Sequence, residues 1–358
     1  MSVTAAHRRP SRREVALRTV AVLVAVLVLL LAAFLVAERL QESGPPVSAS
    51  ACGESGGEAF AVPTGADDPR VQYAPLVFLH PRELRLPLST ECFIAHSRLT
   101  WASAGRGVVQ QTKQGEVDAK RLGAADPYTS DLAGRPCEAG AVGCFRATDH
   151  TRPFDSGRGP LTGRVGFALD VDDAFRSGLA SASVGPVYTG APVYLQAEPG
   201  FITYWFFYGF SAAGGRFDSR GISTFGHEGD WERISVHLDE AGNPLEVAYF
   251  EHAGPPLLLL WAQTPRLDTH PIVFSGLGSH ASYPAEDGPQ QKRNADSTQV
   301  GRLWPTWVQI VDVHDKPWFG FGGAWGAAGI GPARLAKELT GPLGPSPYKT
   351  PAPAEWRR

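Results

Sequence analysis

The sequence predicts a mostly β fold: one β-sandwich domain with a few short helices, preceded by a single transmembrane helix. An uncharged apolar run occupies Thr19–Ala37. Beyond about residue 71, short runs of Val, Ile, Tyr, Phe and Trp alternate with Gly, Pro, Asn and Asp, which is typical of strands and turns. Hydrophobic residues make up 43% of the chain and charged residues 19%, so a sizeable core can form.

The apolar run has the length and the flank of a membrane anchor. At 1.5 Å per residue, a helix over Thr19–Ala37 is about 28 Å long, which matches a bilayer core of roughly 30 Å. Arginines precede it, opposed only by Glu14: Arg8, Arg9, Arg12, Arg13 and Arg18. This basic flank predicts a cytoplasmic N-terminus and export of everything after Glu38.

A cleaved signal peptide is the competing interpretation. Its apolar region is about 7–15 residues long and is followed closely by a small-residue cleavage site. Here the run is longer, and the nearest Ala-x-Ala, Ala49–Ala51, lies well beyond its end. Cys52 follows that tripeptide as in a lipoprotein, but it too lies far from the apolar run. We therefore predict a retained anchor.

The chain divides by composition into five segments. They are a cytoplasmic basic segment (1–18), the anchor (19–37), a flexible tether rich in Gly, Ser, Pro, Ala and Glu (38–70), the extracytoplasmic β-sandwich domain (71–349) and a tail (350–358). The single Met and the abundant Ala, Gly and Arg suggest a bacterial origin, and the anchor predicts a location in the cell membrane. The net charge is -3 and no Lys/Arg stripe runs through the folded part, which excludes nucleic acid as a partner. The oligomeric state is left open.

All four cysteines lie on the exported side, where disulfides persist. Cys137 and Cys144 flank a short Gly/Ala-rich loop, which favours that pair and leaves Cys52 with Cys92. Free buried thiols are the alternative, and the absence of a Cys-x-x-Cys spacing argues against zinc.

Several β-prone runs can be placed in order. They are residues 71–79, 191–197, 201–211, 231–238, 245–252 and 307–314. Turn residues between 231–238 and 245–252 predict a hairpin. Short helices are expected at 169–182 and 333–341.

The densest polar group is Gly226–Arg233, where a loop enters a β-run. Side chains alternate along a strand, so Asp230 and Glu232 point to one face. His227 precedes them, and Asp218 lies in a loop that could fold over the same spot. Two carboxylates on one face repel each other unless a cation or a proton intervenes, and this donor set suits Ca²⁺, Mg²⁺ or Mn²⁺. The alternative is a solvated strand start in which a base pairs with the acids.

Two further histidines stand in apolar surroundings, His252 after Glu251 and His280 after Ser279. Either could join the first group to bind a ligand, or could be a core or turn histidine. The aromatic run around Tyr204, Trp205 and Tyr208 could offer a platform to the same ligand, although such residues are more often core.

Five segments in order resemble the family named after vacuolar protein sorting-associated protein 62. The segments are 73–83, 191–211, 227–238, 276–284 and 321–326, and the resemblance spans about residues 71–349. It implies a domain type more than a biochemical activity.

The motif Gly-His-x-x-Asp-Trp-Glu at 226–232 is more distantly similar to the heptad Gly-His-Arg-His-Asp-Trp-Glu of the necrosis- and ethylene-inducing-peptide-like proteins. Those are secreted β-sandwich cytolysins that bind a divalent cation and plant sphingolipid headgroups. The resemblance implies cation contacts at His227, Asp230 and Glu232, with Asp218 near a further Asp position. Glu228 and Gly229 replace an Arg and the second His, so toxin activity is not implied.

The sequence thus predicts a membrane-anchored domain with a divalent-cation site at Asp218, His227, Asp230 and Glu232 that binds a glycan or lipid headgroup. One alternative is a metal-dependent hydrolase of envelope esters or phosphoesters, with His227 or His280 as general base. Another is a purely structural envelope protein.

Overall fold

The computed structural model describes residue 52 and the ranges 68–103, 107–123, 126–149, 165–177, 185–212, 226–252, 254–294, 296–329, 340–347 and 351–356. All of them belong to the second of two compact units, Pro46–Arg358. The predicted anchor at 19–37 lies outside the described residues. Among the residues that are described, no helix is long and apolar enough to cross a membrane.

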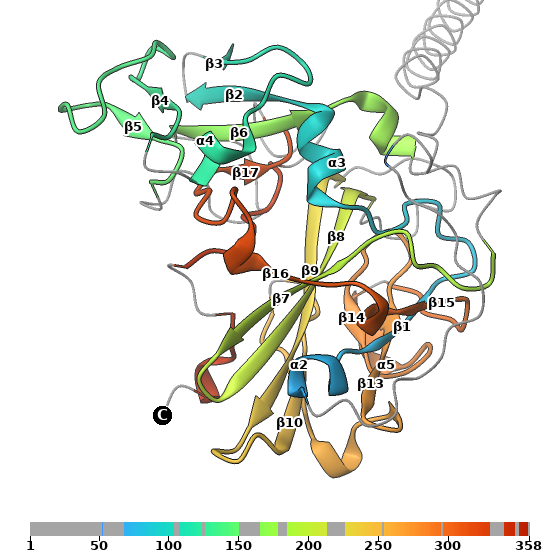
Figure 1. Ribbon diagram of the computed structural model, residues 1–358. Helices are drawn as coiled ribbons and strands as arrows, with labels where there is room; N and C mark the ends of the chain where they lie inside the picture. The colour runs from blue at the N-terminus through green and yellow to red at the C-terminus, as the bar shows by residue number, and fades with distance from the viewer. Residues whose placement is uncertain are drawn as a thin grey trace, which may run out of the picture. The chain divides into compact units, whose positions relative to one another are not determined.

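The largest sheet has six strands in the order β11-β10-β9-β8-β7-β16 (Figure 1). Its members are β7 (Val193–Glu198), β8 (Phe201–Ser211), β9 (His227–Leu238), β10 (Pro244–Tyr249), β11 (Leu257–Leu260) and β16 (Ile310–Asp312). The predicted hairpin is confirmed: β9 and β10 pair antiparallel, and the Asp239 carboxylate accepts the backbone N–H groups of Ala241 and Asn243 in the turn.

A second sheet of five strands follows the order β12-β13-β1-β15, with β14 on β13. Its members are β1 (Leu76–Leu79), β12 (Arg266–Leu267), β13 (His270–Ser275), β14 (Ser282–Tyr283) and β15 (Arg302–Pro305). Only the end of the predicted strand 71–79 is β1. Helix α2 (Pro69–Gln72) takes the start, because Asp68 caps it by accepting the Arg70 N–H and Pro69 favours a helix start.

A third sheet, β17-β6-β2-β3, has four strands, and β4 and β5 form a separate pair. These are β2 (Ser97–Ser103), β3 (Gly107–Gln110), β6 (Val165–Val171), β17 (Ala324–Trp325), β4 (Thr129–Ser130) and β5 (Phe145–Arg146). The helix expected at 169–182 is wrong at its start: Leu169 and Val171 pair with β2, and a 3-10 turn, η2 (Asp173–Ser177), follows. Most of the helix expected at 333–341 lies outside the described residues.

The described helices are few and short, as predicted. Besides α2 they are α3 (Thr90–Ala95), α4 (Ala119–Gly123) and α5 (Pro289–Asn294), with 3-10 turns η5 (Trp261–Gln263), η6 (Thr306–Val308), η7 (Val313–Asp315) and η8 (Ala354–Trp356). Turns η6 and η7 flank β16, so only the middle of the predicted strand 307–314 is extended.

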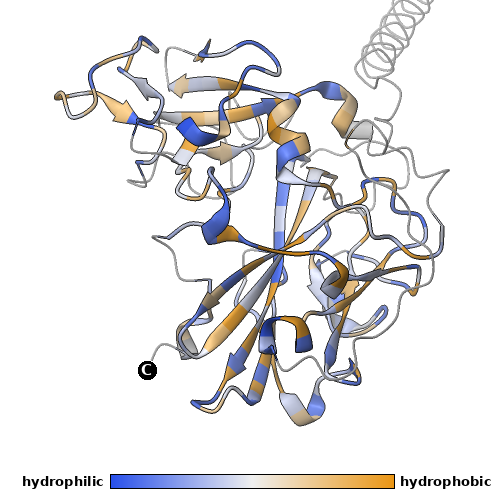
Figure 2. Cartoon of the chain, viewed as in Figure 1, coloured by the Kyte–Doolittle hydropathy of each residue, from blue (hydrophilic) through white to orange (hydrophobic). Residues whose placement is uncertain are grey.

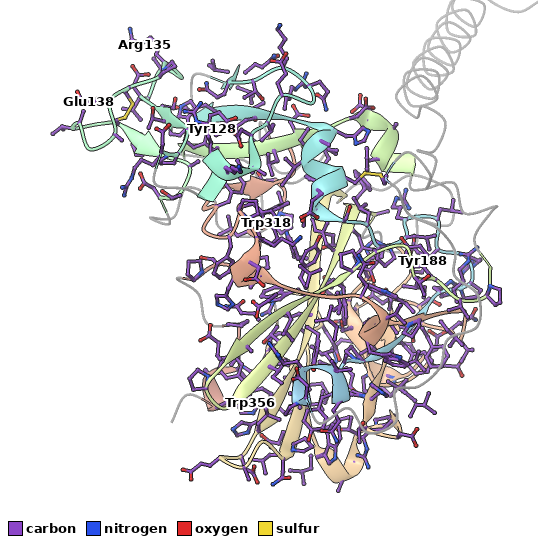
Figure 3. The ribbon with its side chains drawn as sticks, viewed as in Figure 1. Tyr128, Arg135, Glu138, Tyr188, Trp318 and Trp356 are labelled. Carbon is purple, nitrogen blue, oxygen red and sulfur yellow. A yellow bond between two sulfur atoms is a disulfide. The ribbon has the colours of Figure 1, made fainter. Side chains whose placement is uncertain are left out.

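Strand β8 lies at the centre of the core, and all of its residues are buried. On one face Phe206 packs against Trp304 of β15, with 5.5 Å between ring centroids. On the other face Phe207 packs against Trp325 of β17 at 5.3 Å, among indoles that include Trp318 (Figure 3). Hydrophobic and hydrophilic residues are interleaved along the strands of this sheet (Figure 2). The mostly β prediction is confirmed, but a third sheet is added to the predicted two-layer sandwich.

Two disulfides are present in the predicted pairing. Cys52–Cys92, called here the α3 disulfide, joins residues 40 positions apart and ends on α3. Cys137–Cys144, called the loop disulfide, closes a loop of sequence separation 7, beside Glu138 in Figure 3.

Candidate functional site

Asp230 and Glu232 lie on the face of β9 that turns toward the five-stranded sheet. They stand opposite Tyr208 and Phe206 of β8, whose side chains pack on that sheet. This confirms that the two carboxylates share a face. Just before them, Gly229 has φ +59°, and a Cβ there would overlap the Trp325 carbonyl oxygen. Glycine is therefore required for the close approach that starts the site.

A buried ion triad holds Asp230. His280 Nδ1 lies 2.9 Å from Asp230 Oδ2, and its Nε2 lies 3.6 Å from Glu83 Oε2. The imidazole stacks on the Tyr208 ring with 3.8 Å between centroids, and the His280 backbone is left-handed at φ +56°. The backbone N–H of Gly278 donates to Glu83 at 2.6 Å. The triad thus ties β9 to two loops.

Glu83 and His280 form an ion pair at neutral pH. Burial alone would raise the pKa of Glu83, but the charge of His280, whose Nε2 lies 3.6 Å away, and hydrogen bonds from backbone N–H groups lower it to about 2. Burial alone would lower the pKa of His280, but Glu83 and Asp230 together raise it to about 9. His280 is therefore a buried imidazolium, which cannot accept a proton in catalysis.

Among the residues that the structure describes, Glu232 has no comparable counter-ion. It is half-buried, and within the described residues nothing donates a hydrogen bond to its carboxylate. Burial and the charge of Asp230 raise its pKa well above the usual value, and Arg233 only partly offsets them. The Arg233 guanidinium lies over the Phe250 ring, 3.7 Å from its centroid. A cation or a proton at Glu232 would relieve this repulsion.

A second polar network interacts electrostatically with the two carboxylates of β9. His252 Nε2 lies 2.8 Å from Asp296 Oδ2, which also accepts the Tyr283 hydroxyl, and Asn294 donates to Glu251 at 2.9 Å. The hydrogen bond with Asp296 raises the pKa of His252. Asp296 contributes to the raised pKa of Glu232, and Asp230 to that of His252, so the two groups influence each other.

The remaining predicted residues are placed as follows. His227 Nδ1 is 2.7 Å from the Gly229 carbonyl oxygen, and in the described part of the chain it contacts neither carboxylate. Asp218 lies outside the described residues. Tyr204, Trp205 and Tyr208 are core residues with at most 6% exposure, so the aromatic-platform prediction is not supported by their placement.

Sequence reasoning missed Glu83, Tyr283, Asn294 and Asp296. Glu83 follows β1, and the other three lie in or near a polar stretch whose letters resemble any solvated loop. No local spacing connects these positions to β9, because tertiary folding alone brings them there.

Carboxylate oxygens such as those of Glu232 and Glu251 are the kind of ligand that hard divalent cations prefer. No described residue donates a hydrogen bond to Glu232, and the buried Glu251 Oε1 also lacks a hydrogen-bond partner within the described residues. Among the described residues, the Glu232 and Glu251 oxygens do not belong to a group of three ligand atoms close enough to share a metal ion. In that part of the chain, the group with ligand atoms within 4.8 Å of one another is Cys52, Cys92 and His96. Its sulfurs are joined in the α3 disulfide, so they are not thiolate ligands.

Comparisons with known proteins provide no argument about the function of this site. No family model matches the chain, and no curated protein matches it. A similar solved structure is that of necrosis and ethylene inducing protein 2 from the causal agent of cocoa's witches' broom disease. It shares 13% identity over 72% of this chain and 77% of that chain, at a TM-score of 0.29. That score supports no argument about function, and the resemblance to the vacuolar protein sorting-associated protein 62 family stays a prediction.

Proposed function

We propose that the chain is a membrane-anchored, extracytoplasmic β-rich protein that binds a divalent cation at Asp230 and Glu232. Asp218 and His227 are the further ligands that the sequence suggests. The cation would hold a polar ligand, a glycan or a lipid headgroup. The observation that carries the proposal is the Glu232 carboxylate beside Asp230, whose raised pKa Arg233 offsets only in part.

The surrounding residues have separate roles in this proposal. His280 holds the Asp230 carboxylate in place through a hydrogen bond, but at 1% exposure it is too buried to touch a ligand. His252 has a side chain that is 36% exposed, on a buried Asp296, and can donate a hydrogen bond to an anionic group of the ligand. Of the two predicted ligand-binding histidines, the proposal therefore retains His252.

The decisive test is metal content and thermal stability of the full chain in detergent micelles, with and without EDTA. A ligand that binds only the folded state stabilises it by mass action. We expect about one divalent ion per chain in the native protein, a lower Tm in EDTA, and neither effect in Glu232→Gln. Glu116→Gln is the matched control, because Glu116 is a surface carboxylate whose partner among the described residues is the exposed Lys113. An EDTA-insensitive, metal-free native protein would leave the purely structural role.

Hydrolysis of envelope esters or phosphoesters is the second candidate, and the His252–Asp296 pair favours it. A half-exposed imidazole oriented by a buried carboxylate is the arrangement of a general base. His280 is charged and buried, so it is unsuited to that role. Release of p-nitrophenol from p-nitrophenyl phosphate or acetate, lost in His252→Asn, would support the hydrolase. Equal turnover by the variant would reject this assignment.

The anchor is tested separately. We expect the full chain to stay in the membrane pellet after alkaline carbonate washing, and a chain lacking residues 1–37 to be released.

A further inference from the structure

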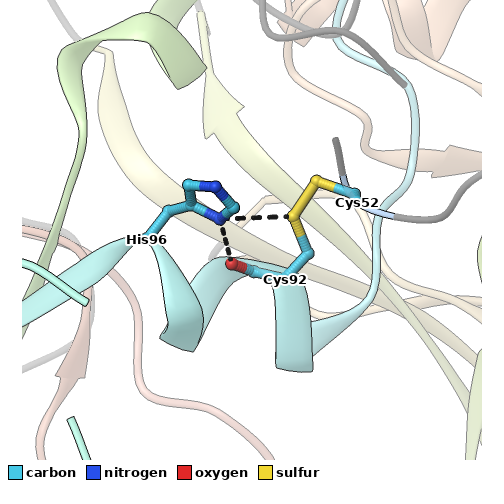
Figure 4. A group of neighbouring side chains, drawn as sticks. All are labelled: Cys52, Cys92 and His96. Carbon is cyan, nitrogen blue, oxygen red and sulfur yellow. Dashed lines mark hydrogen bonds between the residues drawn. A yellow bond between two sulfur atoms is a disulfide. The ribbon is translucent and has the colours of Figure 1, made fainter. Parts of the chain in front are cut away.

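The α3 disulfide has a histidine one helical turn away (Figure 4). Helix α3 begins after Ser89, whose hydroxyl accepts the Cys92 N–H, and His96 follows its last residue. Positions four apart lie on one side of a helix, so the imidazole comes over Cys92. His96 Nδ1 lies 3.7 Å from Cys92 Sγ and 2.9 Å from the Cys92 carbonyl oxygen.

These two contacts determine where the proton is. A carbonyl oxygen can only accept a hydrogen bond, so His96 Nδ1 carries the hydrogen. A protonated nitrogen has no lone pair for a metal, which argues against reading Cys52, Cys92 and His96 as a metal site. The same N–H is a donor placed beside Cys92 Sγ, and a thiolate accepts a hydrogen bond far better than a disulfide sulfur does.

The two sulfurs differ in access. Cys92 is 6% exposed within the core, whereas Cys52 is only partly buried against it. An incoming thiolate would therefore reach Cys52 more readily. The departing sulfur would then be that of Cys92, the one next to the His96 N–H.

We propose that the α3 disulfide is a thiol-exchange site for dithiols, with His96 as the positioning residue that stabilises the departing Cys92 thiolate. A thiolate of the dithiol attacks Cys52 Sγ and forms a mixed disulfide. The Cys52–Cys92 bond breaks, and its electron pair goes to Cys92 Sγ, which accepts the His96 N–H. The second thiol, as thiolate, attacks the mixed disulfide and releases Cys52 as thiolate. Two electrons pass from the dithiol, which leaves as a disulfide.

The loop disulfide provides an internal control. Cys137 and Cys144 are both half-exposed, and within the described residues no histidine ring contacts either of them. If accessibility alone governed reduction, this bond would open first. If stabilisation of the leaving thiolate governs it, the less accessible α3 disulfide opens first.

The experiment is a time course of reduction of the full chain by dithiothreitol without denaturant. Samples are quenched with N-ethylmaleimide, and each cysteine is quantified by peptide mass spectrometry. We expect the α3 disulfide to open first in the native protein. A lower leaving-group pKa speeds exchange; for a lowering of the Cys92 pKa by about one unit, and a dependence on leaving-group pKa as strong as that on the attacking thiol, His96→Phe should slow its opening roughly threefold. The loop disulfide should keep its rate.

Variants and a second readout protect the test from folding artefacts. His314→Gln changes an exposed histidine paired with Asp312 and should leave both rates unchanged. If His96→Phe does not fold, as judged by near-UV circular dichroism, His96→Gln replaces it. In the reduced protein, Cys92 should be alkylated by iodoacetamide at lower pH than Cys137, and His96→Phe should remove that difference. Earlier opening of the loop disulfide in the native protein, or equal rates in the His96 variants, overturns the proposal.

Discussion

The acid limb of the stability curve should depend on Glu83. Its pKa falls from 4.5 to about 2 in the folded protein, because the charge of His280 and backbone hydrogen bonds outweigh the effect of burial. Each tenfold change in proton affinity is worth about 1.4 kcal/mol, so this carboxylate stabilises the fold by about 3 kcal/mol when ionised. Glu83 is 2% exposed, so solvent screening reduces this value little.

The direction of the change in stability with pH follows from the lowered pKa of Glu83, because the ionised carboxylate is the form that stabilises the fold. The stabilisation is fully present above pH 4.5 and is lost as the pH falls toward 2. The free energy of unfolding should therefore decrease by about 3 kcal/mol over that interval. Glu83→Gln should already lack this stabilisation at pH 6, and removing one partner of a buried pair costs about 3–5 kcal/mol. Urea denaturation between pH 2 and 7, with EDTA present to exclude cations, measures both effects.

The alkaline limb reports the same contact from its other side. His280 has its pKa raised to about 9, so its contribution is complete below pH 6.5 and is lost as the pH rises through about 9. The two limbs reflect one interaction and are not added. Glu116→Gln is again the control. If Glu83→Gln keeps the native slope between pH 4.5 and 2, the carboxylate is not ionised against His280 and the reasoning fails.

Two further outcomes are expected. Gly229→Ala should destabilise the protein by at least about 3 kcal/mol in urea, because the left-handed backbone costs about 1–2 kcal/mol and the Cβ overlaps the Trp325 carbonyl. Gly200→Ala, at φ +85° with no atom within 4 Å, should cost only the backbone part. Replacing the α3 disulfide by two alanines should cost about 4 kcal/mol, against about 2 kcal/mol for the loop disulfide, because their sequence separations are 40 and 7. Equal costs would contradict the loop-entropy argument.

Local sequence patterns predicted the central part of the fold. The run 201–211 coincides with β8, and alternation along β9 placed Asp230 and Glu232 on one face. The disulfide pairing also followed from a short loop and elimination. These features depend on near neighbours, which is why period and spacing were sufficient.

The rest of the site depends on contacts between distant residues. Glu83 receives the Gly278 N–H from 195 positions away, and His280 reaches Asp230 across 50. Strand β1 pairs with β13 in parallel, which no turn signal announces. Similarly, the tyrosine and tryptophan side chains of β8 suggest a ligand platform from sequence alone, but tertiary packing buries every residue of the strand.

The two carboxylates of β9 should respond in opposite ways to neutralisation. Asp230 has His280 as its counter-ion, so Asp230→Asn should destabilise the protein in EDTA. Glu232 is held beside Asp230 without a described hydrogen-bond donor, so Glu232→Gln should leave stability in EDTA equal or higher, because it removes a repulsion. Added Ca²⁺ or Mg²⁺ should then raise the Tm of the native protein and not that of Glu232→Gln. A lower Tm for Glu232→Gln in EDTA would show that Glu232 has a structural partner, and the case for a cation there would fail.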